Sequence, residues 1–202
     1  MKTRRFIFIM LALLAVQASL FAQDKKMTRK EKEAAWRAER LRKRAQEARQ
    51  VMHDDSIQFV QAVNAIRSGS WALEASNVTF NNGVTRFVTA STNFVSVDDG
   101  QAVVQTAFNN SNVNSPNGLG GITLEGRITS EELKMDKDGN VYYNYGIQGA
   151  DISATVNIVV TANSNQATAT VNPNFSSNQM TFSGYIYPYD TAGVIEGNPG
   201  YY

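Results

Sequence analysis

The sequence predicts a mainly β protein with an N-terminal helical region. Its strands should form an antiparallel meander that makes a barrel, a half-barrel or a two-layer sandwich capped by a helix. Two observations carry this prediction. From Trp71 onwards, short β-branched and aromatic runs are broken by Asn, Asp and Gly, as in strands joined by turns. No helical pattern follows Trp71, so parallel strand–helix–strand units are not expected.

The first 22 residues have the pattern of a signal peptide. A basic start that includes Arg4 and Arg5 precedes an apolar run at residues 6–16. This run is shorter than the about 20 residues that a transmembrane helix needs. Cleavage is expected near Ala22, with cleavage after Ala18 or an uncleaved anchor as alternatives. We therefore expect a periplasmic or secreted protein with no transmembrane segment in the mature chain.

Charge divides the rest of the chain into a basic arm and an acidic domain. Residues 25–49 hold eleven Lys or Arg and four Glu, whereas residues 54–202 hold five basic and thirteen acidic residues. Such asymmetry can indicate a nucleic-acid or membrane contact. Nucleic acid is not expected here because Trp36 alone interrupts the basic residues, where a nucleic-acid reader would interleave aromatics. We expect a solvated arm; docking on the acidic domain and contact with anionic lipid stay open. The expected organisation is a signal peptide at 1–22, a basic helical arm at 23–53, a β-rich domain at 54–190 and a tail at 191–202.

Two helices are expected before the strands. Thr28 and Glu31 form a capping box at the start of the first helix, which should cover residues 29–50 because they are rich in Ala, Lys, Arg and Glu. The second should cover residues 56–67, with caps from Asp54, Asp55 and Ser56. Its expected core-facing residues recur every third position: Ile57, Val60, Val63 and Ile66.

Ten strands are expected in the domain. Residues 81–83, 98–100 and 138–140 contain Asn, Asp and Gly and should form hairpin turns. The strands should then pair with their sequence neighbours. The expected ranges are 71–80, 84–90, 92–98, 101–109, 121–129, 131–136, 140–148, 150–162, 165–172 and 179–187.

Residue counts exclude several chemistries. The chain has no cysteine and one histidine, His53, so disulfides, thiol catalysis and zinc sites built from His or Cys are excluded. His53 precedes the domain, and no catalytic residue, cofactor or metal site is predicted. The stretch 136–140 resembles half of a calcium loop but has Ile147 where the bidentate Glu would stand, so a turn is expected.

One enzymatic alternative depends on paired carboxylates. Its candidates are Asp98, Asp99, Glu125 and Asp151. A glycosidase-type pair would need two of these carboxyl groups about 5–9 Å apart. Asp98 and Asp99 are explained most simply as turn residues, and Glu125 alternates outward between apolar neighbours.

The candidate ligand surface is formed by tyrosines and glycines. Tyrosine-rich strands can form a wet aromatic groove, although Tyr also favours ordinary strand surface. The glycine-rich stretch at 116–121 lacks the Gly-Lys-Ser/Thr ending of a phosphate-binding loop and should form turns or a ligand-contacting loop. The candidate residues are Tyr143, Tyr145, Tyr185, Tyr187, Gly118 and Gly120.

Three short stretches resemble a known family. They are Ser68–Ala75 (SGSWALEA), Gly120–Ile128 (GGITLEGRI) and Phe182–Pro188 (FSGYIYP). The chain resembles the domain-of-unknown-function family 4251 of secreted gut Bacteroidetes proteins over roughly residues 30–190. The resemblance implies an exported protein with a charged helical arm and a β-rich domain. It implies no activity and no site residues, and residues 103–114 depart from an aromatic stretch that other members often carry.

Three functions follow as hypotheses. The leading one is a non-enzymatic binding or interaction module for a protein, glycan or lipid partner, because the sequence offers no catalytic constellation. The first alternative is a hydrolase that uses an acidic pair. The second is a lipocalin-like small-molecule carrier, which requires a closed barrel with an apolar cavity.

Overall fold

The structure is a computed structural model that describes residues 27–108 and 118–198. The predicted signal peptide and the last residues of the predicted tail lie outside these ranges. The chain divides into two compact units, Met1–Arg49 and Gln50–Tyr202. No helix within the described residues is long and apolar enough to cross a membrane.

One continuous helix, α2 (Arg29–Ser68), replaces the two helices that the sequence predicts. Its start is confirmed: the Thr28 amide donates to the Glu31 carboxylate (2.7 Å), and the Glu31 amide donates to Thr28 Oγ1 (3.3 Å). The predicted second cap at Ser56 is wrong, because Ser56 Oγ donates to the Met52 carbonyl one turn earlier. A serine that bonds back in this way lies within a helix and does not begin one.

The C-terminal turns of α2 pack against the barrel core. Ala62, Val63, Ala65 and Ile66 are buried, and Phe59 is partly buried against the same core. The predicted stripe is right at Val63 and Ile66 and wrong at Ile57 and Val60, which are exposed. Residues spaced strictly by three drift around a helix of 3.6 residues per turn, so the buried face follows a mixed spacing of three and four.

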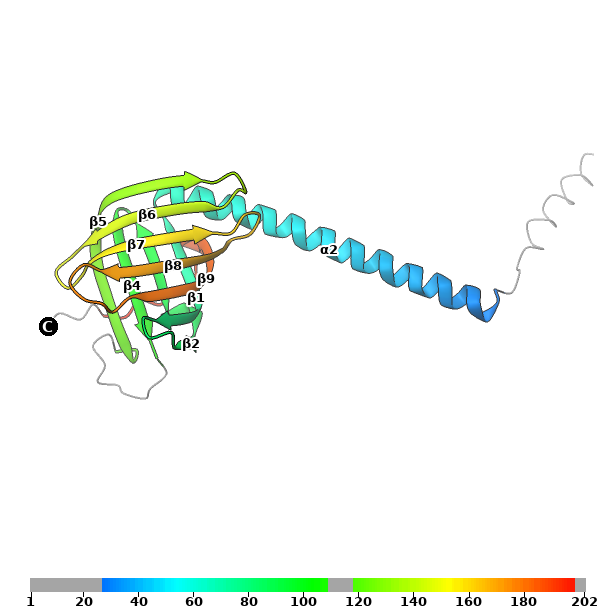
Figure 1. Ribbon diagram of the computed structural model, residues 1–202, viewed down its shortest axis with the longest axis horizontal. Helices are drawn as coiled ribbons and strands as arrows, with labels where there is room; N and C mark the ends of the chain where they lie inside the picture. The colour runs from blue at the N-terminus through cyan, green and yellow to red at the C-terminus, as the bar shows by residue number, and fades with distance from the viewer. Residues whose placement is uncertain (1–26, 109–117, 199–202) are drawn as a thin grey trace, which may run out of the picture. The chain divides into compact units, whose positions relative to one another are not determined.

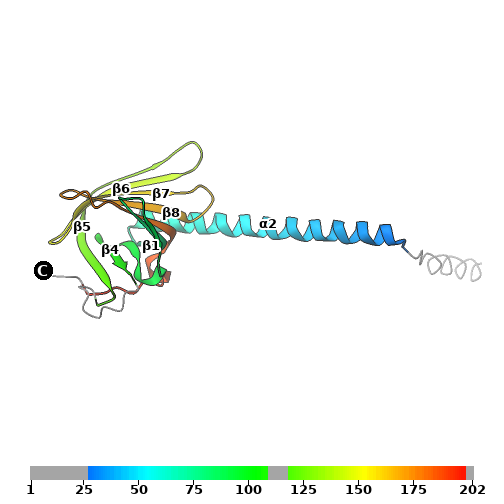
Figure 2. The same cartoon turned by 60° about the horizontal axis from the view of Figure 1, so that its bottom comes forward.

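The β-rich unit is a closed antiparallel barrel of eight strands (Figure 1; Figure 2). Each strand of the meander pairs with its neighbour, and β1 closes the ring by pairing with β9. The short β2 pairs with the second half of β1. Of the barrel, half-barrel and two-layer sandwich that the sequence left open, the barrel is confirmed. The strands are β1 (Trp71–Phe80), β2 (Thr85–Phe87), β3 (Phe94–Asp98), β4 (Gln101–Ala107), β5 (Gly121–Met135), β6 (Val141–Gln148), β7 (Ser153–Val160), β8 (Gln166–Pro173) and β9 (Met180–Pro188), with 3₁₀ turns η1 (Ala90–Thr92) and η2 (Tyr189–Thr191).

Strand β5 is the main departure from the predicted strands. The sequence predicts two strands at 121–129 and 131–136, whereas the structure has one strand of 15 residues. Its register with β6 shifts between Ile128 and Glu131, which marks a bulge. Residues 121–127 pair with β4, and residues 127–135 pair with β6. A bulge lets one strand bend and serve both parts of a curved sheet.

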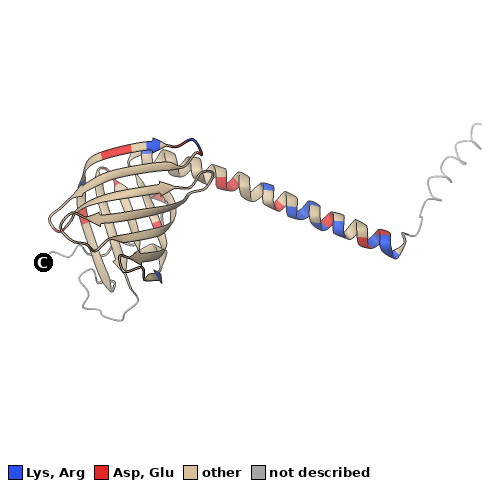
Figure 3. Ribbon diagram, in the orientation of Figure 1, with Lys and Arg blue, Asp and Glu red and all other residues tan. Residues whose placement is uncertain are grey.

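The barrel interior is apolar and aromatic. Trp71 lies edge-on to both Tyr143 and Tyr145, with ring centroids 6.1 and 6.2 Å apart. Alternate residues of β6 and β7, such as Val156 and Ile158, complete the core. Figure 3 shows that charged residues are sparse on most of the barrel strands and frequent on the N-terminal part of α2.

Candidate functional site

The four candidate tyrosines lie on opposite sides of the barrel wall. Tyr143 and Tyr145 are buried inside it, at 2% and 1% exposure. Tyr185 is exposed on the outside of β9, and Tyr187 is half-buried on the same face. Because the wall separates the two pairs, they do not form one tyrosine-lined groove. Tyr143 and Tyr145 belong to the core.

The two candidate glycines lie in the turn that precedes β5. Gly118 and Gly120 have φ angles of +70° and +90°, which residues with a Cβ rarely adopt. The Phe108 amide donates to the Gly120 carbonyl at 3.2 Å. These glycines therefore shape the entry into β5.

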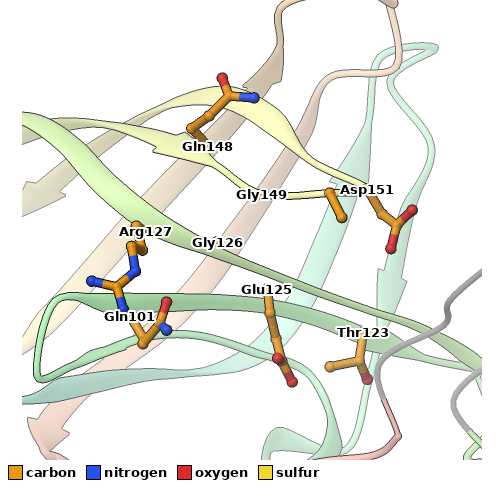
Figure 4. A pocket seen from close by; sticks show the side chains of 9 residues that line it. Gln101, Thr123, Glu125, Gly126, Arg127, Gln148, Gly149 and Asp151 are labelled. Carbon is orange, nitrogen blue, oxygen red and sulfur yellow. The ribbon is translucent and has the colours of Figure 1, made fainter.

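A cleft of about 320 Å³ lies on the outer face of β5. Figure 4 shows Arg127 beside Gln101 and Glu125 beside Thr123, with Asp151 approaching from the turn between β6 and β7. This volume falls at the small end of ligand sites in proteins. Its lining is polar, with Gln101, Thr123, Glu125, Gly126, Arg127, Gln148, Gly149, Ala150 and Asp151.

Strand pairing fixes a polar row in this cleft. Arg127 is the register partner of Gln101 on β4 and of Gln148 on β6. Register partners in an antiparallel sheet lie on the same face, so Gln101 and Gln148 are the neighbours of Arg127 on the two adjacent strands. Within the described residues Arg127 forms no ion pair. Its charge is available to an anionic group in the cleft.

Two glycines let the β6–β7 turn approach β5. A Cβ on Gly149 would lie 2.0 Å from the Glu125 carbonyl oxygen, and one on Gly126 would lie 2.6 Å from Ile147 Cγ2. Neither distance is compatible with a real Cβ. The glycine at position 149 therefore brings Asp151 to the same cleft as Glu125.

The four candidate acids separate into two groups. Glu125 and Asp151 line the cleft together. Asp98 instead accepts a hydrogen bond from Ser70 Oγ at 2.7 Å, and Asp99 sits in the β3–β4 turn with φ +47°. The sequence indicates Glu125 and Asp151 as candidate acids. It does not show that the β6–β7 turn brings Asp151 to the same cleft as Glu125.

The sequence analysis missed Glu196, which lies in the predicted tail. Partial burial, then a hydrogen bond with the Glu125 carboxyl and its negative charge, together raise the pKa of Glu196 to about 7. The carboxyl pair joins the edge of the cleft to the C-terminal segment.

Residues 192–198, here called the C-terminal strap, cross the outer face of the barrel. The Gly193 amide donates to Glu74 Oε1 (2.5 Å), and the Ile195 amide donates to the Ser91 carbonyl (2.7 Å). Gln105 binds the strap at two points: Nε2 donates to the Ile195 carbonyl, and Oε1 accepts from the Gly197 amide, both at 2.8 Å. The strap is thus an ordered part of the fold.

The remaining sequence candidates have structural roles. In the 136–140 turn, Asp136 accepts hydrogen bonds from the amides of Asp138 and Asn140, so the predicted turn is confirmed. The Asn140 side chain is the main cause that lowers the pKa of Asp136. His53 is exposed on α2 beside Asp54. Across residues 27–108 and 118–198, no three His, Asp or Glu side chains are grouped to hold a metal ion.

The fold and the cleft define a class: an antiparallel eight-stranded barrel with a helix packed on its core and a small polar cleft on its outer face. Residues 53–186 match the sequence profile of a family described as a domain of unknown function, DUF4251. The chain belongs to this family, as the resemblance implied.

A solved structure supports the same conclusion. The chain is similar to a DUF4251 family protein from Bacteroides eggerthii DSM 20697, whose crystal structure was determined at 1.95 Å resolution. The two share 42% sequence identity with a TM-score of 0.60, over 70% of this chain and 94% of that one. Comparison with curated proteins gives no match.

Proposed function

We propose that this protein is a non-enzymatic binding module whose outer cleft binds a small zwitterionic ligand, such as a short peptide with both ends free. The observation that carries the proposal is the charge arrangement of the cleft. The guanidinium of Arg127, which forms no ion pair among the described residues, shares one cavity with the carboxylates of Glu125 and Asp151. A carboxylate of the ligand would bind Arg127, and an ammonium group would bind the acids.

The chemistry of the cleft favours a peptide over a neutral glycan. None of the described residues that line it is aromatic, whereas sugars are commonly held by stacking on aromatic rings. Among the described outer residues, Tyr185 and Tyr187 are on β9, which is not one of the strands that line the cleft. The amides of Gln101 and Gln148 can donate to and accept from peptide groups.

The barrel interior gives weaker support to a carrier function. The closed barrel meets one requirement of the carrier hypothesis. However, the rings of Trp71, Tyr143, Tyr145 and Phe182 lie inside and are at most 2% exposed. These side chains occupy space that a carried ligand would need.

The test is to titrate the protein with an unmodified tripeptide and to follow its backbone amide chemical shifts by NMR. We expect the shifts to concentrate at Gly126, Gly149 and their neighbours. Blocking either the amino or the carboxyl end of the peptide should weaken binding. Arg127→Gln should weaken binding about tenfold or more, because a charge-assisted hydrogen bond contributes about 1.5–3 kcal/mol. Arg86→Gln, on the exposed strand β2, is the matched control. Equal affinity for the Arg127 variant and the unaltered protein would refute the proposal.

We also propose that the protein is exported after cleavage near Ala22. The basic start and the apolar run at 6–16 support this proposal. Expression in a Bacteroides host, followed by mass spectrometry of the periplasmic and secreted fractions, tests it. The expected mature protein begins at Gln23; an intact N-terminus in the cytoplasmic fraction would contradict it.

A further inference from the structure

The N-terminal part of α2 carries more positive charge than its own acids balance. Residues 25–49 hold eleven Lys or Arg and four Glu, and blue outnumbers red along this part of the helix in Figure 3. Every residue from 29 to 49 is exposed, and all of them belong to the first compact unit. The helix therefore presents an excess of cationic side chains to solvent.

Five of these basic side chains form two rows on one face of α2. Residues spaced alternately by three and four lie on the same face of a helix. Along α2 this spacing gives an apolar line in which Leu41, 66% exposed, is the one large side chain; the others are Ala34, Ala38, Ala45 and Ala48. The basic rows run along the two sides of this line, with Lys30, Arg37 and Arg44 on one side and Arg42 and Arg49 on the other.

The basic rows are unpaired, whereas charges on the far side of the helix have partners. None of the five side chains forms an ion pair among the described residues. On the far side, Lys43 pairs with Glu39 at 3.5 Å, and the Arg40 guanidinium lies 4.7 Å from the centre of the Trp36 ring. The positive charge left without a partner is thus concentrated beside the apolar line.

A groove of about 440 Å³ lies over the first part of this face. It is hollow because small alanine side chains stand between longer basic ones. Glu33 is the acid among its described lining residues, and Glu33 is already paired with Arg29 at 3.5 Å. The lining residues are Lys30, Glu33, Ala34, Arg37, Ala38 and Leu41.

We infer that this face of α2 is a docking surface for an acidic amphipathic helix of another protein. The apolar side chains of that helix would pack over Leu41 and the alanines, and its Asp and Glu would lie opposite the two basic rows. The unpaired basic rows carry the inference, since they require negative charge on both flanks of the occupant. This surface is distinct from the cleft, so the inference does not depend on the proposed function.

The charges of the face argue against a second copy of the chain as the occupant. When two helices pack along such lines, the flanking residues of one meet the flanking residues of the other. In a parallel or an antiparallel pair of α2 helices, Arg37, Arg42 and Arg44 would therefore face arginines or lysines. Like charges across an interface are strongly unfavourable.

The apolar line is also too slight for insertion into a membrane. A helix that lies in a lipid interface buries a wide face with large side chains such as Trp, Phe and Leu. Here Leu41 is the one large residue of the line, and Trp36 lies on the far side of the helix. An occupant that brings its own apolar side chains and its own acids matches the face better.

Binding of a designed helix tests the inference with the chain from Gln23 to Tyr202. The probe is a labelled synthetic peptide of about four heptads with Leu and Ala along its apolar line and Glu in both flanking rows. Fluorescence anisotropy measures its affinity, and circular dichroism its helicity. A peptide of the same composition in scrambled order should bind at least about tenfold more weakly, because its acids no longer flank an apolar line.

Two charge-reversal variants separate the face from overall charge. Arg37→Glu combined with Arg44→Glu should weaken binding about tenfold or more, because it places like charges opposite the acids of the peptide. Lys32→Glu combined with Lys43→Glu changes the net charge equally on the far side of the helix. At about 0.15 M salt, where exposed charges more than about 8 Å apart are largely screened, this control should weaken binding less than about threefold. Circular dichroism checks that both variants keep their helix.

Several results would overturn the inference. Equal losses in the two double variants, or equal affinity for the scrambled peptide, would reduce the effect to overall charge. Tighter binding to phosphatidylglycerol vesicles or to a DNA duplex than to the acidic helix would assign the face to lipid or to nucleic acid. Self-association in sedimentation experiments that the Arg37 and Arg44 reversals abolish would assign it to a second copy.

Discussion

Gln105 of strand β4 holds Ile195 of the C-terminal strap through a hydrogen bond of 2.8 Å from Nε2 to the Ile195 carbonyl. The same nitrogen donates to the Thr92 carbonyl, and Oε1 accepts from Thr123 Oγ1. Gln105 is fully buried although it points away from the barrel interior. A second layer, made by the strap, therefore covers this part of the wall.

Replacing Gln105 should release the strap and destabilise the fold. Gln105→Ala removes donors and acceptors for the Ile195 carbonyl and the Gly197 amide, so we expect the free energy of unfolding to fall by about 2 kcal/mol. Denaturant unfolding measures the loss, and exchange of the Gly197 amide reports the strap. Gln166→Ala, at an exposed position of β8, is the control and should change stability by less than about 0.5 kcal/mol. An unchanged Gly197 exchange rate in the Gln105 variant would show that other contacts hold the strap.

The sequence allowed most of the barrel to be predicted and little of the strap. Alternation in β6 and β7 distinguishes inner from outer residues because one face of each strand meets the core. The same rule makes Gln105 a solvent-facing residue, since it lies between Val104 and Thr106. Its burial depends on residues about 90 positions later, whose sequence has no regular period.

The candidate site could also be predicted only in part. The sequence indicates Glu125 and Asp151 as candidate acids, but their proximity depends on Gly149 and on strand register, which a single sequence does not show. Glu196 could not be predicted as a site residue, because residues 191–202 lack a strand pattern and resemble a tail. Residue type alone indicates the four tyrosines as a ligand surface, whereas the alternation within β6 puts Tyr143 and Tyr145 on its apolar face.

The end of α2 should contribute strongly to stability. Ile66 is 3% exposed against the barrel core, whereas Val60, on the same helix, is 55% exposed. Ile66→Ala should lower the free energy of unfolding by about 2–4 kcal/mol through lost burial and a cavity. Val60→Ala is the matched control, with an expected loss below about 0.5 kcal/mol. Thermal and denaturant unfolding measure both; equal losses would mean that the helix end does not pack on the core in solution.

The buried tyrosines should make the barrel sensitive to alkali. Burial, followed by the hydrogen bond to Glu131 at 2.8 Å, raises the pKa of Tyr143, and burial also raises that of Tyr145. The unfolded chain ionises these groups near about pH 10, so folding keeps their protons and stability declines as pH rises above that value.

Tyrosinate absorbance and circular dichroism, followed together during alkaline titration, test this expectation. The last tyrosines should ionise only as the barrel unfolds. Tyr143→Phe removes one such group, so its stability should decline less steeply above about pH 10. Complete ionisation of every tyrosine while the circular dichroism of the barrel is intact would contradict the prediction.

Gly149 should be required both for the fold and for the cleft. A Cβ at this position would lie 2.0 Å from the Glu125 carbonyl oxygen, which belongs to the backbone and cannot rotate away. Gly149→Ala must therefore push the β6–β7 turn from β5, at an expected cost of about 1–3 kcal/mol in the free energy of unfolding. The same shift separates Asp151 from Glu125, so peptide affinity should fall even where the variant is fully folded. Gly193→Ala is the control, because its Cβ would meet Glu74 Oε1 at an ordinary 3.5 Å. Unchanged stability and affinity in Gly149→Ala would mean that the turn can move away without disturbing the cleft, and that Asp151 is not needed there.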